Sequence, residues 1–324
     1  MKTRKLGWTD LELTAIGFGT WALGGSGWKF AWGAQDDNES IAAIRRGLEL
    51  GINWVDTAFV YGLGHSEEVV GRAIQGLKPR PIVATKCGRR GKPGGDIHGD
   101  LRTASVREEC HNSLRRLQVD CIDLYQIHWP DPDGQLEEGW GAIAQLVKEG
   151  KIRYAGVSNF SVAQMERVQK IHPVASAQPP YSMLRRDVEA DVLPFCKAQR
   201  IGVVAYGPMH EGLLTGAFTK ERAASLPQDD FRSRNPYFTE PQLSVNLETI
   251  ARLKELAARQ RLTCGQLAIA WVLRREEVTS AIVGARRPAQ IEETHKAADV
   301  VLAPALLQEI ETVLAERKKK LGAK

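Results

Sequence analysis

Short runs of apolar residues alternate with longer amphipathic stretches along the chain. The stretches repeat apolar residues at the spacing of one helix face, as in SIAAIRRGLELG from Ser40. Three of them end in a glycine, at Gly51, Gly76 and Gly150, which is a common way for a helix to stop. The apolar runs predict eight buried strands. They lie at 15–20, 52–57, 81–86, 122–128, 153–158, 176–178, 203–206 and 280–283.

Strands that alternate with helices are expected to pair in parallel, because a parallel connection needs a long crossover. Two α/β architectures fit this order: a doubly wound open sheet and a closed (β/α)8 TIM barrel. The count of eight favours the barrel. The glycine signature of the open sheet, Gly-x-Gly-x-x-Gly, is also incomplete at 17–19 and at 62–64. We therefore expect residues 1–324 to form a single barrel domain.

Two segments depart from the alternation. Residues 4–17, RKLGWTDLELTAIG, predict a β-hairpin, which we expect to cap the bottom of the barrel. Residues 207–241, after the seventh strand, show little periodicity, and a loop of that length is typical of a functional lid or of disorder. The segment carries Leu213, Leu214, Phe218, Phe231, Tyr237 and Phe238, so we expect it to pack against the domain.

Composition limits the class of protein. The chain is 43% hydrophobic and 26% charged, as globular proteins are. No run approaches the roughly 18 apolar residues of a membrane-spanning helix, and the N-terminus lacks the apolar core of a signal peptide. The five cysteines are scattered, without a CxxC pair, as in a reducing compartment. We expect a cytoplasmic protein with no membrane partner.

The formal net charge of +5 raises the question of a nucleic-acid partner. Residues 316–324 hold five basic residues and one acidic residue, so +4 of this charge belongs to the tail. A basic tail on a nearly neutral body is typical of a solvated, frayed helix end. We therefore expect no nucleic-acid partner, and a chain that is a monomer or a weak homo-oligomer.

Candidate chemistry lies at the strand ends, where TIM barrels build their active sites. Asp56, Lys86 and His128 end the second, third and fourth expected strands, and Tyr61 follows the second. An ammonium lowers the pKa of a nearby tyrosine, a carboxylate fixes the ammonium, and a histidine can orient a carbonyl oxygen. Such a group donates a proton to an oxyanion as a hydride reaches carbon. The same residues also fit a core histidine and a buried ion pair.

Other catalytic motifs are missing from the sequence. There is no HExxH, GxSxG or GxxxxGK[ST] motif and no set of kinase motifs. The seven histidines show no paired spacing, so we expect no metal site.

Several ordered motifs together resemble the aldo-keto reductase superfamily, and within it the bacterial aldehyde reductases related to potassium-channel β subunits. The motifs are NWVDTAFVYGLGHSEEVVGRAI (53–74), IVATKCG (82–88), DLYQIHWPDP (123–132), GKIRYAGVSNF (150–160) and VGARRPAQIEET (283–294). The resemblance implies a (β/α)8 barrel that binds NADPH (NADP) in an extended pose. It makes Tyr61 the general acid, Lys86 and Asp56 its tuning pair, and His128 the orienting group.

The resemblance also implies a cofactor site. Trp21 would lie by the nicotinamide, Tyr206 would stack on its ring, and Arg286 would hold the 2′-phosphate, with Arg287 in reserve. A surface arginine at a helix start is the alternative for Arg286. The implied residues are Thr20, Trp21, Asp56, Ser158, Asn159, Gln178, Tyr206, Gly207, Pro208, Met209, Gly212, Leu213, Leu214, Gly216, Lys220, Gly284, Arg286, Gln290, Glu293 and Thr294.

These implications predict NADPH-dependent reduction of a small aldehyde or ketone. One alternative is an NAD(P)-dependent dehydrogenase that oxidises a polyol or sugar at the same site. Another is a cofactor-sensing binding protein like the channel β subunits. Trp21, Trp28, Trp32 and Trp129 are expected near the barrel mouth. They suit either an apolar carbonyl substrate or an oligomer contact.

Overall fold

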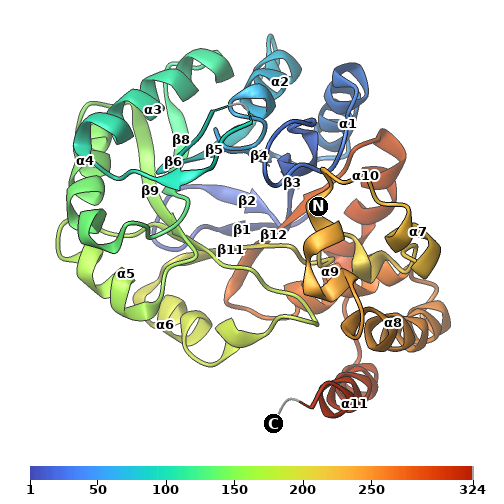
Figure 1. The fold of residues 1–324 in the computed structure, drawn as a ribbon. Helices are drawn as coiled ribbons and strands as arrows, with labels where there is room; N and C mark the ends of the chain where they lie inside the picture. The colour runs from blue at the N-terminus through green and yellow to red at the C-terminus, as the bar shows by residue number, and fades with distance from the viewer. Residues whose placement is uncertain (93, 323–324) are drawn as a thin grey trace.

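The computed structural model describes residues 1–92 and 94–322. Eight parallel strands close into a barrel, which confirms the predicted (β/α)8 architecture (Figure 1). The ring follows chain order and closes where the last strand pairs with the first. The strands are β3 (Ile16–Gly19), β4 (Trp54–Asp56), β5 (Ile82–Cys87), β8 (Ile122–Ile127), β9 (Ile152–Ser158), β10 (Ser176–Gln178), β11 (Gly202–Tyr206) and β12 (Val278–Gly284). All eight predicted strands are present.

Helices surround the barrel and bury the outer faces of its strands. This burial on both faces explains the continuous apolar runs, and all six residues of β8 are buried. Gly51, Gly76 and Gly150 follow three of these helices with φ of +92°, +77° and +68°, the left-handed conformation that glycine adopts readily. The surrounding helices are α1 (Asp37–Glu49), α2 (His65–Ile74), α3 (Thr103–Leu117), α4 (Leu136–Lys148), α5 (Val162–Gln169), α6 (Val192–Gln199), α9 (Cys264–Leu273) and α10 (Pro288–Thr294).

The N-terminal hairpin caps the barrel as predicted. β1 (Thr3–Lys5) pairs antiparallel with β2 (Glu12–Thr14), and the two lie across the centre of the ring in Figure 1. Three hairpin leucines are buried against side chains from inside the barrel. This cluster contains Leu6, Leu11 and Leu13 with Trp54, Ala84, Leu124, Val204 and Ile282. The hairpin therefore completes the core at the end of the barrel opposite the C-terminal ends of the strands.

The segment at 207–241 is ordered into short helices that the sequence pattern did not predict. Each is a single turn or little more, too short to show a hydrophobic period. Leu213, Leu214, Phe218 and Phe238 are buried, which confirms that the segment packs on the domain. The helices are η4 (Leu213–Thr215), α7 (Lys220–Ala224), η5 (Phe231–Arg234) and η6 (Pro236–Phe238). A small hairpin, β6 (Arg89–Arg90) with β7 (His98–Gly99), was also not predicted.

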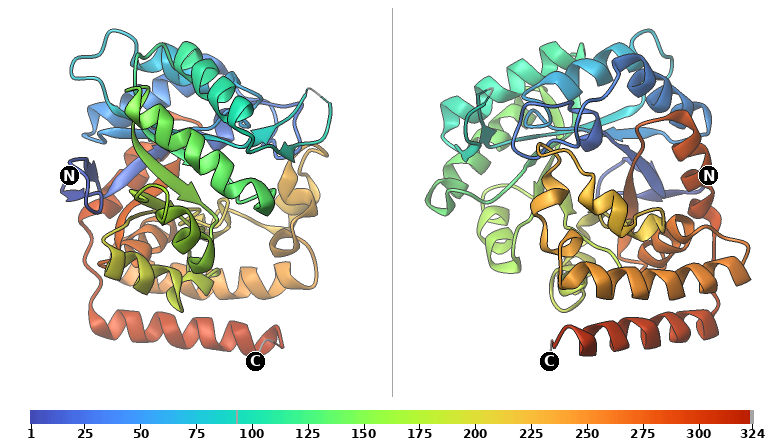
Figure 2. Two further views of the ribbon diagram at one scale, coloured as in Figure 1. Left: turned by 90° about the vertical axis from the view of Figure 1, so that its left-hand side faces the viewer. Right: turned by 45° about the vertical axis from the view of Figure 1, so that its right-hand side comes forward.

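The C-terminal helix α11 (Pro304–Lys320) runs beside α8 (Gln242–Arg259) on the outside of the barrel (Figure 2). The tail, for which we expected a frayed helix end, is instead helical as far as Lys320, and Arg317 is half-buried. Lys324 lies outside the described residues. Within 1–92 and 94–322, no helix is long and apolar enough to cross a membrane.

Candidate active site

The strand ends bring three of the four predicted catalytic residues into one hydrogen-bonded group. The Nζ atom of Lys86 donates to Asp56 Oδ1 at 2.6 Å, to the Thr57 carbonyl at 2.8 Å and to Tyr61 Oη at 3.2 Å. Lys86 is only 1% exposed. The second oxygen of Asp56 accepts from Gln178 Nε2 at 2.8 Å. The lysine, the carboxylate and the phenol are thus fixed relative to one another.

The loop between β4 and α2 places Tyr61 at this point. Gly62 has φ of +70°, and a Cβ there would lie 2.1 Å from the Gly24 carbonyl oxygen, so the close crossing of the two loops requires glycine. Behind the loop, buried hydroxyls link neighbouring elements: Ser66 Oγ donates to Thr20 Oγ1 at 2.8 Å and lies 3.0 Å from Thr57 Oγ1. These contacts hold the tyrosine without using its hydroxyl.

Burial controls the protonation of the phenol. Burial, with a smaller effect of Asp56, raises the pKa of Tyr61 well above its usual value. This direction is opposite to the one expected from the lysine alone. Burial also lowers the pKa of Lys86, while Asp56 favours its ammonium form. Since Lys86 donates to the phenolic oxygen, the phenolic proton is free to point elsewhere.

His128, the fourth predicted residue, follows β8 and lies edge-on to Tyr61, with ring centroids 5.7 Å apart at 83°. Burial lowers its pKa well below the usual value, and the charges of Lys86 and Arg89 lower it further. The imidazole is therefore neutral at physiological pH and can offer an N–H group to a carbonyl oxygen.

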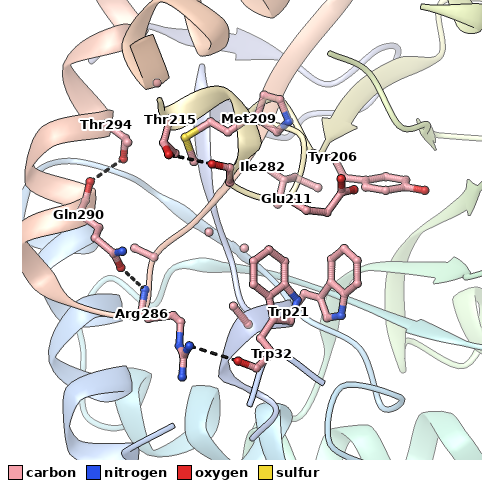
Figure 3. Close-up of a pocket in the computed structure, with 18 of the residues that line it drawn as sticks. Trp21, Trp32, Tyr206, Met209, Glu211, Thr215, Ile282, Arg286, Gln290 and Thr294 are labelled. Carbon is pink, nitrogen blue, oxygen red and sulfur yellow. Dashed lines mark hydrogen bonds between the residues drawn. The ribbon is translucent and has the colours of Figure 1, made fainter. Parts of the chain in front are cut away.

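A cavity of about 350 Å³ runs from Tyr61 to α10. Aromatic side chains stand at one end and polar side chains of α10 at the other (Figure 3). The predicted residues that line it are Thr20, Trp21, Asp56, Tyr61, Tyr206, Gly207, Pro208, Met209, Gly212, Gly284, Arg286, Gln290, Glu293 and Thr294. Residues from the first and last parts of the chain thus share one cavity.

Three further predicted residues lie next to the cavity in a polar network. Ser158 Oγ donates to the Gln178 carbonyl at 2.9 Å, and Asn159 Nδ2 donates to the His128 carbonyl at 3.0 Å. The Tyr206 hydroxyl donates to Asn159 Oδ1 at 2.9 Å. The network ties the ends of β9, β10 and β11 to His128 and to the Asp56–Lys86–Tyr61 group.

Four more predicted cofactor residues neither line the cavity nor belong to this network. The side chains of Leu213 and Leu214 are fully buried in the core. Gly216 is closed off by Lys254, whose Cδ lies 2.6 Å from the position that a Cβ would take. Lys220 is exposed on α7, with its Nζ 3.6 Å from Glu240. Any role for these residues in cofactor binding stays a prediction.

Several lining residues were not predicted, and three carry side chains suited to a ligand: Glu211, Arg222 and Arg232. Arg232 is buried and forks onto both oxygens of Asp230, at 3.0 and 2.6 Å. Its guanidinium also lies 4.5 Å from the ring centroid of Trp32. Their only sequence signal was the presence of arginines and acids within the aperiodic segment.

The predicted tryptophans occupy different places at the mouth. Trp21 stacks near Tyr61, with centroids 6.4 Å apart at 23°, and Trp28 lies 6.2 Å from Tyr61. Trp129 is 40% exposed and lies under Arg89. Trp21 and Trp28 therefore form an apolar wall beside the phenol.

Arg286 is held by the loop at 32–35. Its Nε donates to Gln35 Oε1 at 2.6 Å, its Nη1 donates to the Trp32 carbonyl at 3.3 Å, and its Nη2 donates to the Ala34 carbonyl. Its backbone N–H donates to Gln290 Oε1 at 2.7 Å (Figure 3). Two of the five guanidinium N–H groups remain for a ligand.

The chain is similar in sequence and in structure to known reductases and to a dehydrogenase. The chain is 41% identical over 287 residues to the aldo-keto reductase YhdN of Bacillus subtilis, covering 88% of this chain and 85% of the relative. It is 33% identical to the NADH-specific methylglyoxal reductase of Escherichia coli, covering 94% and 96%. The structure of a glycerol dehydrogenase from Gluconobacter oxydans superposes with a TM-score of 0.87 at 37% identity, covering 98% and 96%.

The family model that matches the sequence, described as the aldo/keto reductase family, spans residues 15–315, from the first barrel strand into the last helix. The barrel, the buried Asp–Lys–Tyr group and this match lead to one assignment. The chain belongs to the aldo/keto reductase family, whose oxidoreductases use a nicotinamide cofactor.

Proposed function

We propose that the protein reduces aldehydes or ketones to alcohols with NADPH. The observation that carries the proposal is the hydrogen bond from Lys86 to Tyr61 Oη at the end of the cavity, with Asp56 holding the lysine. The bond leaves a protonated phenol whose O–H can point to a substrate oxygen.

The side chains then divide the work of proton transfer. When bound, a dihydronicotinamide supplies a hydride to the carbonyl carbon. Tyr61 gives its phenolic proton to the carbonyl oxygen, and the bond from Lys86 stabilises the phenolate that remains. Asp56 keeps the ammonium in place, and neutral His128 orients the same carbonyl oxygen through its N–H group.

The cavity suits a dinucleotide. Gly207 and Gly212, with φ of +67° and +88°, line the cavity without side chains, so a ligand can approach the backbone of the turn after β11 at these two positions. Arg222 and Arg232 line the same stretch and offer guanidinium groups to a pyrophosphate. We assign Trp21 and Tyr206 to the nicotinamide face. Ser158, Asn159 and Gln178 are assigned to its carboxamide, and Gln290, Glu293 and Thr294 to the adenosine.

The preference for NADPH rests on the outer end of the cavity. A second depression there is lined by Ala34, Gln35, Asp36, Glu39, Arg222, Arg286, Arg287 and Gln290. Its three arginines outnumber its two carboxylates, and Arg287 is largely exposed, which suits a 2′-phosphate. One relative is an NADH-specific reductase, so the cofactor preference of this chain requires a direct measurement. We also propose a cytoplasmic location, which the free thiols of all five cysteines support.

A second candidate function is oxidation of a polyol or sugar by the same residues in reverse, with the Tyr61 phenolate accepting the alcohol proton. The structural similarity to a glycerol dehydrogenase supports it. Reduction and oxidation use the same proton path, so the two candidate functions must be separated by the substrates that the protein accepts.

Initial rates test the proposal. Reduction is measured with NADPH and with NADH on short aliphatic aldehydes, aromatic aldehydes and methylglyoxal. Oxidation is measured with the oxidised cofactors on glycerol and sorbitol. We expect the largest kcat/KM for an aldehyde with NADPH. A largest value for a polyol would favour the second candidate, and no turnover with any pair would contradict both.

The substitution Tyr61→Phe tests the assigned proton donor. It should lower kcat by about 10²–10⁴-fold and leave cofactor binding intact, because only the proton donor is lost. Tyr154→Phe is the matched control, since that hydroxyl bonds Asp10 at 2.9 Å from a side chain outside the cavity lining. A Tyr61→Phe enzyme with near wild-type kcat would overturn the assignment.

A further inference from the structure

One carboxylate in the cavity takes no part in the chemistry described above. Glu211 lines the cavity, and its side chain is only 14% exposed. No group in residues 1–92 or 94–322 donates a hydrogen bond to its carboxylate, and its nearest cation-capable neighbour, His210 Nε2, lies 3.7 Å away. Figure 3 shows the carboxylate beside the ring of Tyr206.

The backbone directs this side chain into the cavity at some conformational cost. Glu211 has φ of +50° and His210 has φ of +48°, a region that non-glycine residues adopt rarely. The Oε1 atom of Glu211 lies 3.7 Å from the position of a Cβ on Gly207, so the carboxylate folds back over the glycine turn. Strained residues of this kind occur at ligand sites.

Groups from three other elements surround Glu211. Arg185, before α6, and Arg232, in η5, favour the ionised carboxylate, but burial outweighs them and raises the pKa of Glu211 to about 7. The pKa of His210 is lowered to about 3 by burial, so this imidazole is neutral. The pKa of the Tyr206 phenol is raised by burial, so it is neutral too. The Glu211 carboxyl is therefore the group of this cluster that titrates near neutral pH.

We propose that Glu211 sets the affinity for the dinucleotide, donating a hydrogen bond to a pyrophosphate oxygen when protonated and repelling the pyrophosphate when ionised. The inference rests on the proposed function, which places the pyrophosphate along the Gly207–Gly212 turn and Arg232. On protonation, a carboxylate gains an O–H donor that can bond a pyrophosphate oxygen, and it loses a like-charge contact with the pyrophosphate.

The proposal fixes the direction of the pH dependence. Phosphate charges raise the pKa of a nearby carboxyl further, so binding takes up a proton wherever free Glu211 is ionised. Affinity is then fully developed below about pH 7 and falls as pH rises above it. The Kd can rise by at most about tenfold per pH unit.

The proposed pH dependence is tested by measuring the Kd of NADH and of NADPH from pH 6.5 to 8.5. Binding is monitored through the quenching of tryptophan fluorescence. NADH lacks the 2′-phosphate, which itself titrates near pH 6 as a phosphomonoester does. For wild type we expect the Kd of either cofactor to rise about tenfold between pH 7 and 8.5. In Glu211→Gln, a neutral donor of the same shape, the Kd should change less than about twofold. The exposed α7 variant Glu221→Gln should behave as wild type.

Wild type alone offers a second measurement that does not depend on the variant's folding. Calorimetric titration with NADPH at pH 7.5, in two buffers of different ionisation enthalpy, should reveal net proton uptake. No uptake, or equal pH profiles for wild type and Glu211→Gln, would overturn the role of Glu211 while leaving the proposed function intact. Absence of binding by both cofactors at every pH would overturn the proposed function, and this inference with it.

Discussion

At the candidate active site, burial sets the protonation state of Tyr61 and His128, the two groups that we propose to face the substrate. The pKa of Tyr61 is raised by burial and by Asp56, and the pKa of His128 is lowered by burial and by nearby cations. Both shifts move titration out of the physiological range, in opposite directions. The phenol stays a proton donor and the imidazole stays neutral.

These shifts predict how turnover depends on pH. The proposed carbonyl reduction uses protonated Tyr61, which is present below its raised pKa, and neutral His128, which is present above its lowered pKa. With saturating cofactor, kcat for reduction should therefore vary less than about twofold from pH 6 to 9. Alcohol oxidation needs the phenolate, so its kcat should rise towards pH 10. Rate profiles in both directions check this, and a reduction profile with a pKa between 6 and 9 would contradict it.

At the scale of elements, close helix contacts fix the position of the loop that bears Tyr61. In α2, a Cβ on Gly71 would lie 2.4 Å from the Arg116 carbonyl oxygen of α3. The same two helices are joined by a partly buried ion pair between Arg116 and Glu67, 2.7 Å apart. The Arg116 guanidinium also lies 5.1 Å from the Phe59 ring centroid in the Tyr61 loop. Glycine at position 71 lets α2 approach closely enough for these contacts.

Gly71→Ala should therefore lower the free energy of unfolding by about 1–3 kcal/mol, because the backbone of α3 must move to admit the methyl group. Gly141→Ala in α4 is the matched control, since nothing lies within 4 Å of its Cβ position. There the same substitution should raise stability by about 0.5–1 kcal/mol through helix propensity. Denaturant titration of both variants checks the pair, and equal signs would contradict the packing argument.

The elements with a regular hydrophobic period were those that the sequence predicted best. The eight strands, the helices ending before Gly51, Gly76 and Gly150, and the grouping of Asp56, Lys86 and Tyr61 at strand ends all followed from that period and from barrel geometry. Arg232 and Glu211 were missed, because they come from turns too short to have a period. Their approach to the cavity depends on tertiary packing that local pattern does not encode.

For the molecule as a whole, the basic C-terminus acts through packing. Arg317 on α11 donates from Nε to Asn246 Oδ1 at 2.7 Å, and Asn246 Nδ2 donates to the Tyr237 carbonyl at 2.8 Å. The Arg317 guanidinium lies 5.7 Å from the Tyr237 ring centroid. The ring centroids of Tyr237 and His210 are 4.1 Å apart. The last helix is thereby connected, through η6, to the turn that carries Glu211.

Arg317→Ala should then lower the free energy of unfolding by about 1–2 kcal/mol, since it removes a half-buried stem and leaves Asn246 without its donor. Lys318→Ala removes a neighbouring cation that is exposed, so its effect should stay within about 0.5 kcal/mol. Equal losses of stability would mean that tail charge matters rather than packing. Hydrogen exchange adds a local measure: only Arg317→Ala should speed exchange in η6 and the first turns of α8, because this guanidinium bonds Asn246 and packs on Tyr237.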